Sequence, residues 1–160
     1  MSAVPSEFEW DRLTAARPFL IVAVLAILTS GLVAAAVAYA PTEHAIWMVA
    51  YLALVVGLAQ GVLGVGQALL PIQIPALRFL IAECILFNLG NASVIAGTLL
   101  SSVALVAIGT AVFAASLGMF LYGVRHARPG WPTHAFRALL AITGISAIVG
   151  LVLSIAGAAR

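Results

Sequence analysis

The side chains with the greatest capacity for chemistry lie inside long apolar stretches of this sequence. Glu83 is the one carboxyl well inside such a stretch, and Asn88 and Asn91 follow it on the same predicted helix. Gln60 and Gln67 lie in the preceding stretch, at a spacing that puts both amides on one helix face. In hydrocarbon, groups of this kind either carry protons or ions, or they hydrogen-bond neighbouring helices together.

Glu83 is the central candidate among these residues. An ionised carboxylate in lipid would cost on the order of 2.5–3.5 kcal/mol, so the neutral acid is favoured. One interpretation is a carboxyl that carries a proton or cation. The other is a structural acid bonded to a neighbouring helix, or to Arg78 through water. Because Gln60 and Glu83 are expected at similar depth on neighbouring helices, we predict a hydrogen bond between them.

Three glycines share the predicted helix with the two glutamines. Gly57, Gly61 and Gly64 recur every three or four residues, and glycines at this spacing let another backbone come close in lipid. We therefore predict a helix-packing face at these glycines, on the same side as Gln60 and Gln67. An alternative is that the glycines pack on the first or fifth helix while Gln60 bonds a backbone carbonyl.

The two asparagines extend the polar side of the Glu83 helix. Asn91 falls within about 80° of Glu83 around the helix, and Asn88 lies about 60° beyond it. A polar track from Glu83 through Asn91 towards Thr98 would suit a hydrated path. Amides of this kind also fasten helices, at about 0.6 kcal/mol per bond. A third interpretation is that the Asn-Leu-Gly-Asn run bends this helix or ends it early.

Composition explains why these groups must be positioned by membrane-spanning helices. Of the 160 residues, 64% are hydrophobic and only 8% are charged, whereas soluble domains carry about 25% charged residues. The small net charge of +2 is spread along the chain and does not favour nucleic-acid binding. We therefore expect a multi-pass, all-α helical bundle embedded in a lipid bilayer.

Proline-rich turns and apolar run lengths divide the chain into spans. A cytoplasmic N-terminal segment, residues 1–17, is expected to rest on the membrane surface. A single transmembrane domain, residues 18–158, is expected to follow it. Its expected spans are residues 18–40, 45–70, 76–98, 101–124 and 135–157.

Arginine placement favours five spans over four. As one helix, the stretch 76–124 would be about 73 Å long, more than twice the hydrocarbon thickness. With five spans and a cytoplasmic N-terminus, every arginine except Arg160 lies on the cytoplasmic side. With four spans, Arg125, Arg128 and Arg137 move outside and this bias nearly vanishes. We predict five spans with the C-terminus outside, and the membrane expected is a bacterial inner membrane.

Few other residues indicate a reaction or a cofactor. Cys84 is the only cysteine, so a disulfide within the chain and a cysteine-based metal cluster are excluded. None of the three histidines lies in the middle of a predicted span, which excludes a membrane bis-histidine haem. Ser101 and Ser102 have no nearby base that could activate them as nucleophiles. We assign no catalytic residue, no metal ligand and no cofactor.

Three functional hypotheses follow from this sparse chemistry. The first is a non-catalytic subunit or scaffold of a larger membrane complex, or a homo-oligomer. The second is a small transporter or channel for protons, ions or a small solute that uses Glu83 and Gln60. The third and least supported is a membrane enzyme that acts on lipid, because no acid–base pair faces one site.

Overall fold

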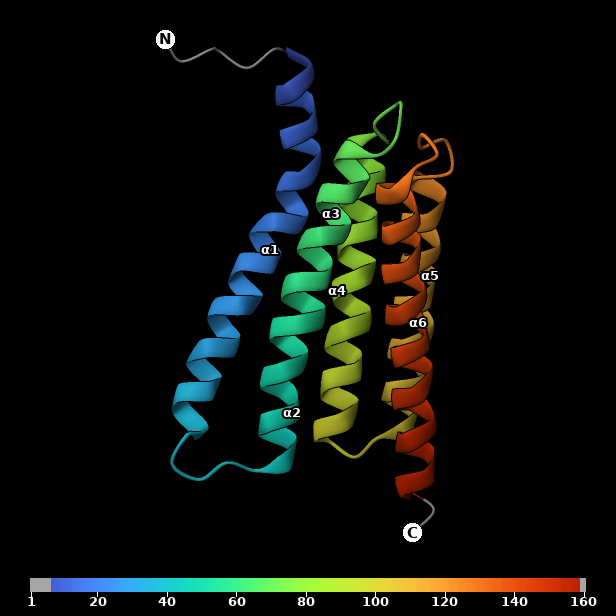
Figure 1. Cartoon of the computed structure of the whole chain (residues 1–160). Coiled ribbons are helices and arrows are strands. Elements are labelled where there is room, and N and C mark those ends of the chain that lie inside the picture. The colour runs from blue at the N-terminus through green and yellow to red at the C-terminus, as the bar shows by residue number, and fades with distance from the viewer. Residues whose placement is uncertain (1–6, 159–160) are drawn as a thin grey trace.

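Long helices that run alternately up and down make up this fold (Figure 1). The structure is a computed structural model that describes residues 7–158, with side chains from residue 12 onward. All the named elements of this described part are helical, in the order α1 (Glu7–Val37), α2 (Glu43–Tyr51), η1 (Leu52–Ala59), α3 (Gln60–Leu69), α4 (Leu77–Leu99), α5 (Val103–Gly123) and α6 (Trp131–Ala158).

The segments α2, η1 and α3 form one helical run from Glu43 to Leu69, in which η1 is a π-helix. Counted with this run, the described chain has five helices long and apolar enough to cross a membrane. For the described residues, the structure confirms the prediction of an all-helical chain with five helices long and apolar enough to cross a membrane. The apolar stretch 76–124 turns back at residues 100–102, where the sequence predicts the turn.

The first helix is longer than predicted, because it begins at Glu7 and contains Pro18 in its interior. Proline inside a helix removes one backbone hydrogen bond. Here the packing of the neighbouring residues offsets that lost hydrogen bond, because Ala15, Ala16 and Phe19 are all buried in the core. The prediction that a helix starts at Pro18 was therefore wrong. Residues 1–6 of the expected surface segment lie outside the described part.

The last helix also starts earlier than predicted, at Trp131 rather than near Ala135. Pro132 then occupies the first turn, where its missing N–H is not needed. The Thr133 hydroxyl donates to the carbonyl of Arg128 at 2.8 Å, which holds the loop against this turn. In α4, Asn88 and Asn91 do not end the helix, which continues to Leu99.

The closest helix pair is α4 with α5. A Cβ atom placed on Gly90 would lie 2.7 Å from the backbone nitrogen of Phe113, and one on Gly97 would lie 2.6 Å from that of Val106. No real side chain fits at such distances, so glycine is required for the two backbones to approach. This hairpin is the rigid support for the polar groups of α4.

Aromatic side chains close the core near the start of α1 and the end of α5. Phe120 packs against Phe19 and Phe87, with ring centroids 5.4 and 5.9 Å apart. Phe87 also packs against Phe113 at 5.0 Å. All four rings are almost fully buried. They form an apolar wall around the polar residues of α3 and α4.

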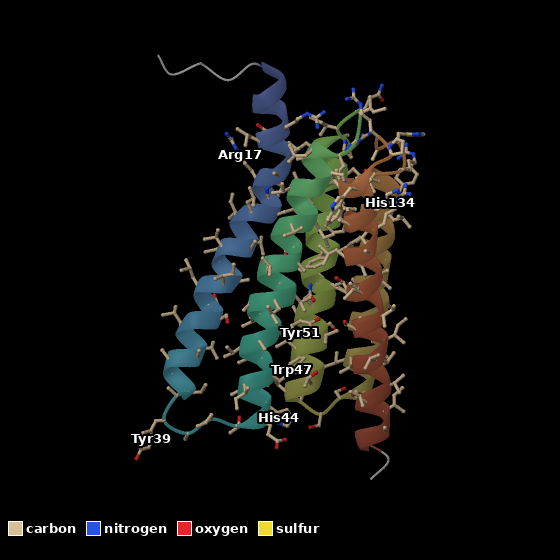
Figure 2. All side chains as sticks on the ribbon, viewed as in Figure 1. Arg17, Tyr39, His44, Trp47, Tyr51 and His134 are labelled. Atoms are coloured by element: carbon tan, nitrogen blue, oxygen red, sulfur yellow. The ribbon has the colours of Figure 1, made fainter. Side chains whose placement is uncertain are left out.

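The two ends of the bundle differ in charge. Figure 2 shows Arg17 and His134 at one end, and Tyr39 and His44 at the other. The described arginines belong to the α1 start, the α4 start, the α5–α6 loop and the first turns of α6, all at the end shown uppermost in Figure 1. We call this the arginine-rich end, defined by Arg12, Arg17, Arg78, Arg125, Arg128 and Arg137.

Candidate functional site

A line of buried and half-buried polar side chains joins the second long helix to α4. The second helix contributes residues from α2 and α3, and α4 contributes an acid, a thiol and two amides. We call this line the polar seam, and its members are Tyr51, Gln60, Gln67, Glu83, Cys84, Asn88 and Asn91. The seam contains all five polar residues predicted from the sequence, together with Tyr51 and Cys84.

The first contact of the seam joins Gln67 to Glu83. The Gln67 amide Nε2 donates to both carboxyl oxygens of Glu83, at 2.9 and 2.7 Å. Both side chains are 0% exposed. Arg78, the other partner considered for this acid, is exposed at the start of α4 and makes no hydrogen bond within the described part of the chain. Glu83 is therefore held by one neutral amide in a dry setting.

The predicted partner of Glu83 was Gln60, and this pairing was wrong. Counted from the α3–α4 loop at 1.5 Å per residue, Gln67, Glu83 and Gln60 lie about 3, 9 and 13 Å along their helices. By their positions along the helices alone, Gln60 and Gln67 are about equally good candidates to bond Glu83. Side chains, however, lean towards the N-terminus of their own helix. Gln67 therefore leans away from the loop and Glu83 leans towards it, so these two side chains meet.

Gln60 instead contacts the thiol of Cys84. Its amide Nε2 donates to the Cys84 sulfur at 3.5 Å. The Asn88 amide Nδ2 donates to the Cys84 carbonyl at 2.8 Å and approaches its sulfur at 3.7 Å. Sulfur is a weak acceptor. Cys84 is therefore a polar contact at the middle of the seam.

The third contact joins Tyr51 to Asn91. The Tyr51 hydroxyl donates to Asn91 Oδ1 at 2.7 Å, and Asn91 Nδ2 donates to the Phe87 carbonyl at 2.8 Å. Asn91 is therefore satisfied on both sides while 1% exposed. The sequence indicates Tyr51 only as an aromatic anchor at the membrane surface. Its packing against Trp47, with centroids 5.0 Å apart, is consistent with that setting.

The π-helical segment η1 explains how Tyr51 reaches the seam. In a continuous α-helix, Tyr51 and Gln60 would point about 180° apart. A π-helix bonds N–H groups to carbonyls five residues earlier and therefore turns less per residue than an α-helix. Over the eight residues of η1, this difference rotates Tyr51 towards the side of the helix on which Gln60 lies. Both side chains then face α4, an arrangement that no pattern in the sequence predicts.

The three glycines pack on α1, as the alternative interpretation expected, and the prediction that they lie on the same side as Gln60 and Gln67 was wrong. A Cβ atom on Gly57 would lie 2.6 Å from Ile27, one on Gly61 would lie 3.4 Å from Ala23, and one on Gly64 would collide with Phe19. Around the helix, these glycines lie about 75° from the two glutamines, on average. This angle is enough for the glycines to face α1 while the glutamines face α4.

Two buried acceptors in the seam have no hydrogen-bond partner in the described part of the chain. They are the side-chain oxygens of Gln60 and Gln67. Leaving such a group unpaired costs about 1–3 kcal/mol. The Gln67 carboxamide lies directly against Gly123, where a Cβ atom would collide with it. An entering proton donor, such as water, would find two ready acceptors about 10 Å apart along the helix.

A separate cavity of about 530 Å³ lies at the end of the bundle opposite the arginine-rich end. Residues from α2, α4, α5 and α6 line it, including Glu43, Trp47, Tyr51 and Thr98. Of the seam residues, only Tyr51 borders this cavity. The predicted polar track therefore divides into a sealed part around Glu83 and a part that reaches the cavity through Tyr51. Thr98 donates to its own helix, at the carbonyl of Val94.

A search of the described residues for groups of histidine, cysteine, aspartate and glutamate able to hold a metal ion finds none. Comparisons with known proteins add no family to this picture. No protein-family model, no curated protein and no solved structure matches the chain. Its function must therefore be inferred from its own geometry.

Proposed function

We propose that the chain is a membrane protein of five spans, with its N-terminus in the cytoplasm and its C-terminus outside. The positive-inside rule supports this orientation, because the described arginines gather at one end of the five helices. The bacterial inner membrane is the membrane that we propose. Within it, we propose that the chain acts as a non-catalytic subunit of a larger complex or as a homo-oligomer.

The observation that carries this proposal is the unfilled side of α6. The buried residues of α6 end at Thr143. Beyond it, small residues recur at a helical spacing along one face and border the 530 Å³ cavity, namely Ala147, Gly150, Ser154 and Gly157. In lipid, such a stripe is where another helix packs closely. The cavity is open on one side, and a second chain or copy packed there would make contacts that the chain alone lacks.

Filling the stripe tests this proposal. A leucine at Gly150, where a Cβ atom meets nothing within 4 Å, should leave the isolated chain folded but block the approach of a partner helix. We expect native mass spectrometry after gentle detergent extraction to show an oligomer or complex for the wild type and a monomer for Gly150→Leu. The matched control is Gly118→Leu, an equally open glycine on α5, which should keep the assembly. A monomeric wild type would contradict the proposal.

A second candidate function is transport of protons, ions or a small solute. One observation favours it, because the cavity ends at Tyr51, whose hydroxyl bonds Asn91 in the seam. Two unpaired amide oxygens and Glu83 continue from there towards the arginine-rich end. Flux through liposomes should then fall strongly in Glu83→Gln but not in Thr143→Val, a buried hydroxyl outside the seam. Equal flux in both variants would remove Glu83 from any mechanism.

A further inference from the structure

A second pocket, of about 660 Å³, lies at the arginine-rich end of the bundle. It is formed where the α3–α4 loop and the start of α4 meet the end of α5 and the loop that follows. An antiparallel bridge between Pro71 and Ala127 ties these two loops together. The pocket is thus built by two connected loops of the fold, rather than by one exposed side chain.

The charged side chains that line this pocket are arginines, and a histidine lies beside them. Arg78 comes from α4, and Arg125 and His126 come from the α5–α6 loop. No aspartate or glutamate is among the residues that line the pocket. Neither arginine forms an ion pair in the described part of the chain, and Arg78 makes no hydrogen bond there. Two arginines thus line one pocket, and most of their N–H groups have no hydrogen-bond partner in the described part of the chain.

Arg125 is held in place by Tyr122. Its guanidinium carbon lies 3.6 Å from the centroid of the Tyr122 ring, and its Nη1 donates to the Tyr122 carbonyl at 2.9 Å. The Tyr122 ring in turn packs near Phe79, with centroids 6.0 Å apart. Stacking of this kind fixes the plane of a guanidinium and leaves its other edge free for an anion. Less side-chain entropy is then lost when a ligand binds.

We propose that this pocket binds the phosphate of an anionic phospholipid headgroup. Arginine pairs match the geometry of phosphate oxygens, which favours phosphate over a simple halide ion. The remaining walls include Ile72, Ile74 and Phe79, apolar groups that suit the glycerol and upper acyl chain of a lipid. A free phosphate ion would gain nothing from these walls. Basic pockets between helices at a membrane surface are suited to lipid headgroups.

This inference does not depend on whether the chain is a subunit or a transporter. It requires only that the arginine-rich end lies at a membrane surface. Among the described residues, no arginine lies at the opposite end, where Glu43 and His44 line the other cavity. The proposal therefore predicts that anionic lipid binds at one end only.

The test is lipid binding by native mass spectrometry of the full chain in detergent. Phosphatidylglycerol and phosphatidylcholine are titrated separately, and the dissociation constant of the first bound lipid is measured for each. We expect the double variant Arg78→Gln/Arg125→Gln to weaken phosphatidylglycerol binding roughly 10- to 30-fold. Phosphatidylcholine binding should change less than about threefold, since its headgroup carries no net charge.

The matched control is Arg128→Gln/Arg137→Gln, which removes the same charge from the same end but outside the pocket. It should leave phosphatidylglycerol binding within about threefold of the wild type. Equal losses in both double variants would mean general surface attraction and would overturn the proposal. Tyr122→Leu supplies a charge-neutral check, because it removes the stacked support of Arg125. It should weaken binding severalfold, whereas Tyr122→Phe should not.

A final arm separates a lipid from a soluble phosphate. Millimolar inorganic phosphate is added at matched ionic strength while the bound phosphatidylglycerol is monitored. We expect the lipid to remain bound, because the apolar walls contribute to its affinity. Displacement of the lipid by phosphate, but not by chloride, would mean that the pocket recognises the free anion. The assignment to a lipid would then be wrong.

Discussion

Gln67 reaches both carboxyl oxygens of Glu83 through a single amide nitrogen, and both side chains are fully buried. The pair joins α3 to α4 just inside the arginine-rich end. The Gln67 side chain is a neutral amide, so the pair does not join opposite charges. The contact therefore resembles a helix-fastening bond more than an ion pair, and this distinction has measurable consequences.

Glu83→Gln should change the stability of the protein by less than about 1 kcal/mol, because an amide oxygen can still accept from Gln67. Glu83→Ala should destabilise it by roughly 2–4 kcal/mol, since it leaves the Gln67 donor unpaired and opens a cavity. Unfolding in mixed micelles, followed by circular dichroism, measures both. Equal losses in the two variants would show that the carboxyl forms a bond that an amide cannot replace.

The Tyr51–Asn91 bond should be visible in a double-mutant cycle. Tyr51→Phe and Asn91→Ala each remove one partner, and the double variant removes both. Because membrane hydrogen bonds average about 0.6 kcal/mol and reach about 1.7 kcal/mol, we expect a coupling energy within that range. The same cycle with Trp47→Phe in place of Tyr51→Phe should give no coupling. A coupling of zero for Tyr51 would contradict the rotation attributed to η1.

Glycine-to-alanine substitutions should separate the tight helix contact from an open face. Gly90→Ala places a Cβ atom 2.7 Å from the backbone of Phe113, so α4 and α5 must move apart. We expect a loss of stability of about 1–3 kcal/mol, typical of an overpacked core. Gly118→Ala meets nothing within 4 Å. It should be neutral or stabilising, by up to about 1 kcal/mol of helix propensity.

Arg12 should slow amide hydrogen exchange at the C-terminal end of α3. Its guanidinium donates to the carbonyls of Ala68 at 2.6 Å, Leu69 at 3.0 Å and Pro71 at 3.4 Å. Positive charge at a helix C-terminus also interacts favourably with the helix dipole. Arg12→Gln should therefore speed amide hydrogen exchange over residues 68–76. Arg17→Gln removes an exposed arginine from the same helix and should leave that exchange unchanged.

Cysteine labelling tests the proposed topology. In a Cys84→Ala background, single cysteines at Ser101 and Gly130 lie in turns at opposite ends of the bundle. A membrane-impermeant maleimide added outside intact cells should label Ser101→Cys only. Gly130→Cys should react only after the membrane is permeabilised. The reverse pattern would invert the orientation, and labelling of both positions from one side would contradict five spans.

Much of the helical framework was predictable from residues alone. Run lengths and prolines predict a helix that ends at Leu70 and a helix that begins at Ala76. The structure ends α3 at Leu69 and begins α4 at Leu77, within one residue of both predictions. The ends of α1 and α6 were harder to predict. Pro18 and Pro132 mark possible helix starts, but only tertiary packing decides whether the helix continues through such a residue.

The composition of the polar seam was also largely predictable, since Gln60, Gln67, Glu83, Asn88 and Asn91 are the amide and carboxyl side chains inside the apolar stretches. Their pairing was not. Pairing depends on the direction in which each side chain leans and on the rotation that η1 introduces between Tyr51 and Gln60. These are differences of a few ångströms and tens of degrees, and no residue pattern encodes them locally.

By itself, then, the sequence determined an all-helical chain with long apolar helices, because hydrocarbon leaves the backbone few other ways to satisfy its hydrogen bonds. It also determined that charge gathers in particular loops. Only the tertiary structure decided that Gln67, and not Gln60, holds Glu83, and that Arg78 and Arg125 share one pocket. Both outcomes depend on contacts between helices distant in sequence, where register and rotation are set by packing.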